Sequence, residues 1–224
     1  MAVNLQSAGR RDDKPSAARM LTLSDNVVAV AMTLLVLQLR VPLLSHPDSP
    51  SQLAARLGGQ SGELVSYLVS FYVIGQFWLA HHRVFSQVAA HGEGLAWWNF
   101  AFLLTITVMP FSASLIGEYG SNPLAVDIFA LNLMLATLAT QALRVFGHRR
   151  DLLVEASDMR AAQAARARAA TMVAIVALSA GLAWWNTTAA KYCWLLIAIM
   201  PWAANRWAAR THRGTAAAAG APGR

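Results

Sequence analysis

The sequence has little charge and almost no cysteine. Only 13% of its 224 residues are Asp, Glu, Lys or Arg, whereas 56% are hydrophobic. Soluble domains carry about 25% charged residues, so this composition excludes an ordinary soluble domain and predicts a protein whose solvent is the lipid bilayer. The single cysteine, Cys193, excludes an intrachain disulfide bond.

The hydrophobic residues gather in stretches long enough to cross a membrane, since a spanning helix needs about 20 mostly apolar residues. We therefore expect an all-α, polytopic membrane protein with both termini on one side. A short helix over Ser51–Leu57 should follow the first span, and the charged, Ala-rich segment Gly147–Ala170 should extend the fifth helix beyond the membrane. The six predicted spans are Leu21–Leu44, Leu64–Ala80, Leu95–Ile116, Leu124–Val145, Thr171–Thr188 and Tyr192–Trp207.

Three regions follow from these spans. Residues 1–18 are polar and carry Pro15, which is typical of a mobile cytoplasmic tail. Residues 19–210 form the membrane domain, and residues 211–224, rich in Ala and Gly, form a disordered cytoplasmic tail.

The basic residues follow the predicted topology. With the N-terminus in the cytoplasm, all but three of the 18 Lys and Arg residues fall inside, the exceptions being Arg40, Arg56 and Lys191. This distribution satisfies the positive-inside rule and places both termini in the cytoplasm. The net charge of +7 therefore reflects membrane topology, and we expect no nucleic-acid partner. Tryptophans near the span ends, Trp194 and Trp207 among them, are expected at the membrane interface.

A polar pair, Ser24-Asp25, precedes the apolar run Val27–Leu39. Both residues are good helix N-caps, which is one interpretation. The other is an interhelical network, because a carboxylate near hydrocarbon is costly without a partner. Candidate partners from the second and third spans lie at the same predicted depth, and they are Trp78, His81, His82, Arg83, Trp98 and Asn99.

Four residues of the first span, Val30, Thr33, Leu34 and Leu37, have the spacing of one helical stripe. Periodicity alone leaves two interpretations open. The stripe faces lipid or packs against another helix, or it lines a narrow apolar constriction that gates a pore by dewetting.

Two chemical alternatives fit the sequence less well. His81 and His82 are adjacent, so on a helix they point about 100° apart, and no cysteine lies nearby to complete a metal site. A hydrolase could be drawn from Ser24, His82 and Asp25, but no glycine-flanked nucleophile elbow surrounds Ser24. We expect no catalytic residue, no metal and no cofactor.

Three ordered blocks resemble the transmembrane-protein-175 family of potassium channels. The first is Arg19, three intervening residues and Leu23-Ser24-Asp25, close to the family's signature of an Arg, three variable positions and Phe-Ser-Asp. The second runs from Phe77 to Phe85. The third runs from Trp98-Asn99-Phe100 to Met109-Pro110-Phe111. The resemblance covers the first three spans, and the last three match only in hydropathy.

The resemblance implies a homotetramer of single-repeat, six-helix subunits in which four copies of the first helix line the pore. Val30, Leu34 and Leu37 would form apolar rings, and Thr33 matches the hydroxyl position associated with cation selection. Leu23 replaces the family's usual Phe and stays apolar, while Val30 is smaller than the usual Ile or Leu and would widen its ring.

The signature motif has its own implied role, which is to hold the pore helix in place. The resemblance pairs Arg19, Ser24 and Asp25 with one Trp, one His and one Asn of the second and third helices. In this sequence those partners are Trp78, His81 or His82, and Asn99.

We therefore expect a potassium-permeable cation channel of the cytoplasmic membrane. The Thr-Val-Gly-Tyr-Gly run of conventional filters is absent from the sequence, so selectivity over sodium should be modest. One alternative is a secondary transporter or accessory membrane subunit, which would typically use broken helices or internal repeats. Another is a membrane enzyme built on Ser24, Asp25 and His82.

Overall fold

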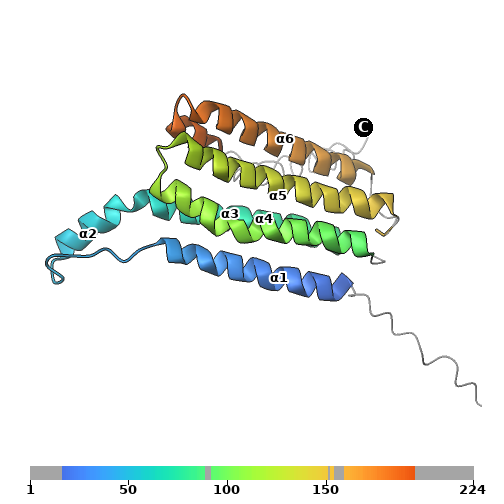
Figure 1. Cartoon of the computed structure of the whole chain (residues 1–224), viewed down its shortest axis with the longest axis horizontal. Coiled ribbons are helices and arrows are strands. Elements are labelled where there is room, and N and C mark those ends of the chain that lie inside the picture. Colours follow the sequence, from blue (N-terminus) through green and yellow to red (C-terminus); the bar gives the residue numbers. More distant parts are fainter. Residues whose placement is uncertain (1–16, 89–91, 151, 154–158, 195–224) are drawn as a thin grey trace, which may run out of the picture.

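The computed structural model describes residues 17–88, 92–150, 152–153 and 159–194. Within them, five helices are long and apolar enough to cross a membrane. Figure 1 shows these helices side by side with a short helix, α2, projecting beyond one end of the bundle. The prediction of an all-α, multi-pass membrane protein is confirmed. The described elements are α1 (Ala17–Leu34), the 3₁₀ segment η1 (Leu35–Gln38), α2 (Pro50–Gly59), α3 (Ser61–Phe85), α4 (Glu93–Glu118), α5 (Pro123–Arg149) and α6 (Met159–Ala183).

Local sequence explains where two of these helices begin. Ser49 accepts a hydrogen bond from the amide of Gln52 at the start of α2, and Asn122 accepts one from the amide of Leu124 at the start of α5. Proline follows each cap, at Pro50 and Pro123, where its missing N–H costs nothing.

Helix α4 lies at the centre of the bundle, because it contacts α1, α3 and α5, whereas α6 packs on α5. Large side chains between these helices, such as Phe102, Ile106 and Phe129, are fully buried. The membrane-length window of α5 is 56% buried and that of α6 only 11%. α1 and α6 therefore lie on opposite sides of the bundle, as Figure 1 shows.

Two predictions about the helices were wrong in detail. The first span was expected to reach Leu44, but η1 ends at Gln38 and Leu39 is already extended. Pro42 favours this early end, because a residue before proline disfavours the α conformation. The fifth span was expected to reach Thr188 but ends at Ala183, with Trp184 and Trp185 in the following turn.

Other predictions have mixed outcomes. The short helix after the first span is confirmed as α2, and α6 does begin before the membrane-length window, at Met159. Trp194, expected at the interface, is only 4% exposed and packs against Phe129 with ring centroids 4.8 Å apart. The two predicted tails, apart from residues 17 and 18, and most of the sixth span, with Trp207, lie outside the described residues.

The start of α3 and the end of α4 approach closely because Gly117 has no side chain. A Cβ atom there would lie 3.2 Å from the Cα atom of Glu63, and backbone cannot move aside as a flexible side chain can. We expect Gly117→Ala to destabilise the protein by roughly 1–3 kcal/mol, since overpacking forces the two helices apart. Thermal unfolding in detergent measures the effect.

The matched control is Gly181→Ala in α6, because a Cβ atom at Gly181 meets none of the described residues within 4 Å. That substitution should be neutral or stabilising, as alanine favours the helix by about 1 kcal/mol over glycine. Equal melting temperatures for the two variants would contradict the close approach.

Candidate functional site

A chain of buried hydrogen bonds joins three helices near the beginning of α1. The side-chain amide of Asn99 in α4 donates to the hydroxyl of Ser24 in α1 over 3.0 Å, and Ser24 donates to the carbonyl of Met20 over 2.8 Å. His81 Nε2 of α3 lies 2.7 Å from Asn99 Oδ1. Because that oxygen can only accept, we assign the proton to Nε2. Asn99 thus links α3 to α1.

His81 is held in this orientation by aromatic rings. It is fully buried, and it stacks against Phe85 and Phe102 with ring centroids 4.4 Å and 4.6 Å away. His82 is exposed and lies beside Trp78, with ring centroids 5.6 Å apart. His81 is therefore the histidine that reaches the signature motif, through Asn99.

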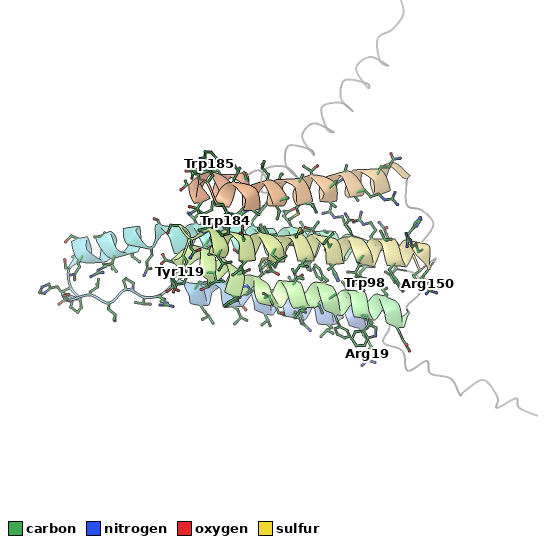
Figure 2. The ribbon with its side chains drawn as sticks, turned by 45° about the horizontal axis from the view of Figure 1, so that its top comes forward. Arg19, Trp98, Tyr119, Arg150, Trp184 and Trp185 are labelled. Carbon is green, nitrogen blue, oxygen red and sulfur yellow. The ribbon has the colours of Figure 1, made fainter. Side chains whose placement is uncertain are left out.

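Asp25 makes a second connection between α1 and α3. The indole Nε1 of Trp78 donates to Asp25 Oδ1 over 2.8 Å, and both side chains are half-buried. Helix α1 begins at Ala17, so Ser24 and Asp25 lie well inside it. The N-cap interpretation of this pair is wrong. Arg19 lies exposed near the start of α1 at the same end of the bundle as Trp98 (Figure 2).

The opposite end of this helix is attached as well, by residues that the sequence analysis missed. The side-chain amide of Gln38 donates to the carbonyl of Pro110 in α4 over 2.9 Å. Arg40 pairs with Glu118 over 3.6 Å, and Gln60 donates to the Arg40 carbonyl over 2.9 Å. Gln38 could have been singled out from the sequence, because it is a polar residue near the end of the apolar run Val27–Leu39.

The predicted stripe lies on the exposed face of this helix. Val30 is 55% exposed, Leu34 44% and Leu37 71%, and Thr33 is exposed as well. Leu37 belongs to η1, where residues three apart eclipse one another, so it stays in line with Leu34. The opposite face, with Ser24, is the one packed into the bundle, and its buried members are Met20, Val28, Ala31 and Leu35.

The Thr33 hydroxyl donates to the carbonyl of Val30 over 2.8 Å, within its own helix. A hydroxyl has one proton and two lone pairs, so this bond leaves the oxygen able to accept. Thr33 thus presents an electron-rich oxygen on an otherwise apolar stripe.

Beside the stripe, an open hollow of about 270 Å³ separates α1 from α4. On the α1 side it is lined by Asn26 and by four apolar residues, Val27, Val30, Ala31 and Leu34, and α4 contributes Thr107. Further along α4, large apolar side chains are also exposed, and they include Trp97, Phe100, Leu104 and Phe111. None of the residues that the structure describes covers this part of the surface.

The alternative chemistries find little support in the described residues. No group of three or more His, Cys, Asp or Glu side chains there could hold a metal ion. Ser24, Asp25 and His82 do not form a triad, because Ser24 bonds to Asn99 and Met20 while His82 lies against Trp78.

A double-mutant cycle tests the connection of α1 to α4. Ser24→Ala and Asn99→Leu each break the buried chain, and Asn99→Leu also leaves His81 Nε2 unpaired at a cost of about 1–3 kcal/mol. We expect the unfolding free energies to show a coupling of about 0.5–3 kcal/mol, because contacting residues are not additive.

The control cycle combines Asn99→Leu with Ser66→Ala. Ser66 is buried as well, but its hydroxyl donates to the carbonyl of Ala113 at a different level of the bundle. These two changes should be additive within about 0.5 kcal/mol. Additivity in the Ser24–Asn99 cycle would show that this hydrogen bond contributes nothing.

The chain is similar to known membrane channels over the region that contains this site. The family model described as endosomal/lysosomal potassium channel TMEM175 matches residues 19–110, which contain the signature motif and the helices that bind it. A solved lysosomal potassium-selective channel TMEM175 homologue from Chamaesiphon minutus has a TM-score of 0.68 at 24% identity. The match covers 82% of this chain and 95% of that one, and it shows the fold.

Curated relatives share sequence over the same region. A potassium channel from Streptomyces collinus is 35% identical over 153 residues, which are 65% of this chain and 73% of that protein. One from Chamaesiphon minutus is 34% identical over 50% of this chain and 55% of its own length. The human endosomal/lysosomal proton channel TMEM175 is 29% identical over 55% of this chain, but only a quarter of the human protein, 25%, is matched. On these similarities, the chain belongs to the TMEM175 family.

Proposed function

We propose that this chain forms a potassium-permeable cation channel with modest selectivity over sodium. The observation that carries the proposal is the placement of the stripe: one face of α1 is bonded into the bundle through Ser24, and the opposite face presents Val30, Thr33, Leu34 and Leu37. The bacterial relatives from Streptomyces collinus and Chamaesiphon minutus are named potassium channels.

The channel is a homotetramer of six-span subunits, with four copies of α1 around one axis. Two features support this assembly. The stripe is mainly apolar and is left uncovered by the described part of the subunit, and the hollow beside it adjoins exposed apolar side chains of α4, such as Phe100 and Leu104. A second copy of the chain would cover both.

The stripe gives the pore its constriction. Rings of Val30, Leu34 and Leu37 exclude water when they close, which blocks ions by dewetting. Four Thr33 hydroxyl oxygens replace part of the hydration shell of an ion at the same level. Such a ring distinguishes potassium from sodium mainly by the cost of removing water, so the preference is modest.

The protein lies in the cytoplasmic membrane with both termini inside. Arg19 and Arg150 mark one end of the bundle and Tyr119, Trp184 and Trp185 the other, as Figure 2 shows. Arg83, Arg144 and Arg168 belong to the first end, which we call the basic end, whereas Arg40, Arg56 and Lys191 belong to the other. The positive-inside rule makes the basic end cytoplasmic.

Ion transport without enzyme activity accounts best for the site, because Ser24 is fully buried and bonded to neighbouring helices. The transporter alternative favours discontinuous helices at the centre of the membrane. Here α1 is continuous over Ala17–Leu34, and Pro110 lies inside the continuous helix α4.

Ion flux into liposomes that contain the purified protein tests the proposal. We expect potassium influx to exceed sodium influx by a few fold, since hydroxyls and desolvation discriminate weakly. A pH-sensitive dye in the same vesicles measures proton flux, because the human relative is named a proton channel. Equal potassium and sodium fluxes would contradict the selectivity, and proton flux alone would overturn the potassium proposal.

Thr33→Val removes the hydroxyl at constant shape and should bring the ratio of potassium to sodium flux close to one while flux continues. Thr171→Val is the matched control, because Thr171 is exposed on α6 and also donates to its own helix, to the carbonyl of Ala167 over 2.9 Å. An unchanged ratio in the Thr33 variant would remove Thr33 from the selectivity mechanism.

Leu34→Ala should increase potassium flux several fold, because shorter side chains leave a wider ring that admits water more readily. The control is Leu135→Ala on α5, where the side chain is 46% exposed against 44% for Leu34. That variant should conduct as the wild type does. Sedimentation or mass measurement in detergent must first show that both variants keep the oligomeric state of the wild type, which we expect to be tetrameric. Equal flux in the two assembled variants would place Leu34 away from the pore.

A further inference from the structure

A polar cavity lies at the end of the bundle opposite the basic end, where η1 meets the start of α3 and the end of α4. Its volume is about 100 Å³, which is enough for several water molecules or one hydrated ion. Figure 2 shows Tyr119, the residue after Glu118, at this end of the bundle. Six of the seven lining residues are polar or charged, and they are Gln38, Arg40, Gln60, Glu63, Ser114 and Glu118.

Two carboxylates meet in the polar cavity. Glu63 belongs to the first turn of α3, and its Cγ atom lies 3.4 Å from the position that a Cβ atom would take at Gly117 in α4. Glu118 is the next residue, and α4 ends there. The side chain of Glu63 therefore lies against the last turn of α4, in space that the missing side chain of Gly117 leaves open.

These carboxylates are poorly neutralised by the described residues. Arg40 faces Glu118 across 3.6 Å, which is longer than a hydrogen bond, and the side chain of Arg40 is 78% exposed. No described residue pairs with Glu63. Two carboxylates against one guanidinium leave the cavity with an excess of one negative charge. The end of α4 adds the partial negative charge of its last carbonyl groups, so the cavity favours a cation.

A buried oxygen on η1 gives independent evidence for a ligand. The side-chain nitrogen of Gln38 donates to the carbonyl of Pro110, but Gln38 Oε1 is buried and has no hydrogen-bond partner among the described residues. A buried acceptor without a partner costs free energy, so a cation or a water molecule should supply the missing contact. Because Gln38 lines the polar cavity, its occupant can do so.

We propose that the polar cavity binds a hard divalent cation such as calcium. Calcium takes about six to eight oxygen ligands from carboxylates, side-chain amides and water. Here Glu63, Glu118 and the Gln38 oxygen are the protein ligands, and water completes the shell. Two carboxylates are fewer than a tight site uses, and the exposed Glu118 leaves the ion open to water. The dissociation constant should therefore be about 0.1–1 mM.

The ion connects three elements that are otherwise joined at this end by few polar contacts. It bridges η1, α3 and α4, and Gln38 directly follows Leu37 of the stripe. Calcium should therefore hold this end of the stripe in place. That effect on the stripe matters for ion flux only if the proposed function is right, whereas binding of the ion does not depend on it.

The test measures calcium binding to the purified full chain in a non-ionic detergent, by equilibrium dialysis and by thermal unfolding. We expect about one calcium ion per chain and a melting temperature that rises with calcium chloride. Potassium chloride of equal ionic strength should not raise it, and an equal rise would contradict a divalent site. Neither measurement requires ion flux, so a negative result here leaves the channel proposal standing.

Glu63→Gln keeps the shape of the side chain, removes one charge and should weaken calcium binding at least about tenfold. Asp48→Asn is the matched control, because Asp48 is exposed in the loop before α2 and does not line the polar cavity. It should bind calcium as the wild type does. Glu118→Gln serves if the Glu63 variant fails to fold, and it should weaken binding as well. Absence of calcium binding in the wild type would show that the cavity holds water only, and equal binding by the Glu63 and Asp48 variants would place the ion elsewhere. Either result would overturn the proposal.

Discussion

A polar group inside a membrane must find its hydrogen bonds within the protein, and this constraint fixes the rotation of α1. Ser24 and Asn99 are both buried, and the amide of Asn99 supplies the donor for the hydroxyl oxygen of Ser24. Turning α1 by one residue would move Ser24 by about 100°, away from Asn99. The same turn would carry Val30 and Leu34 off the exposed face. The direction in which the stripe faces therefore follows from the buried Ser24–Asn99 hydrogen bond. His81 bonds to the side-chain oxygen of the same asparagine.

Polar attachments occur at both ends of this helix. Ser24 and Asp25 bond to α4 and α3 at the basic end, and Gln38 bonds to the Pro110 carbonyl at the other. In between, packing depends on small buried side chains such as Val28 and Ala31, each 2% exposed. Apolar contacts are not directional, so the central part can shift slightly while the ends stay bonded. A constriction that opens by small movements suits this arrangement.

The sequence predicted the described spans well, because length and hydropathy set them, but it predicted lateral contacts only where a family resemblance supplied them. One interpretation of Ser24-Asp25 was a helix start, because the apolar run follows it, but α1 already begins at Ala17. Choosing His81 over His82 required the positions of Phe85 and Phe102, which only the fold brings together. Trp194 was misplaced for a related reason: a tryptophan near a span end prefers the interface unless a core ring such as Phe129 is within reach.

The proposed pore has one polar atom type in its narrow part, and this limits what it can select. The Thr33 proton is engaged with the Val30 carbonyl, so each subunit offers an oxygen and no free donor at that level. Oxygen acceptors attract any small cation, and an ion must lose water to pass the neighbouring Val30 and Leu34 rings. Potassium sheds its water more readily than sodium, so potassium makes fuller use of the Thr33 oxygens and passes the rings faster. A filter of this kind rests on the cost of dehydration, which depends on ring width, and the small side chain of Val30 keeps that cost low.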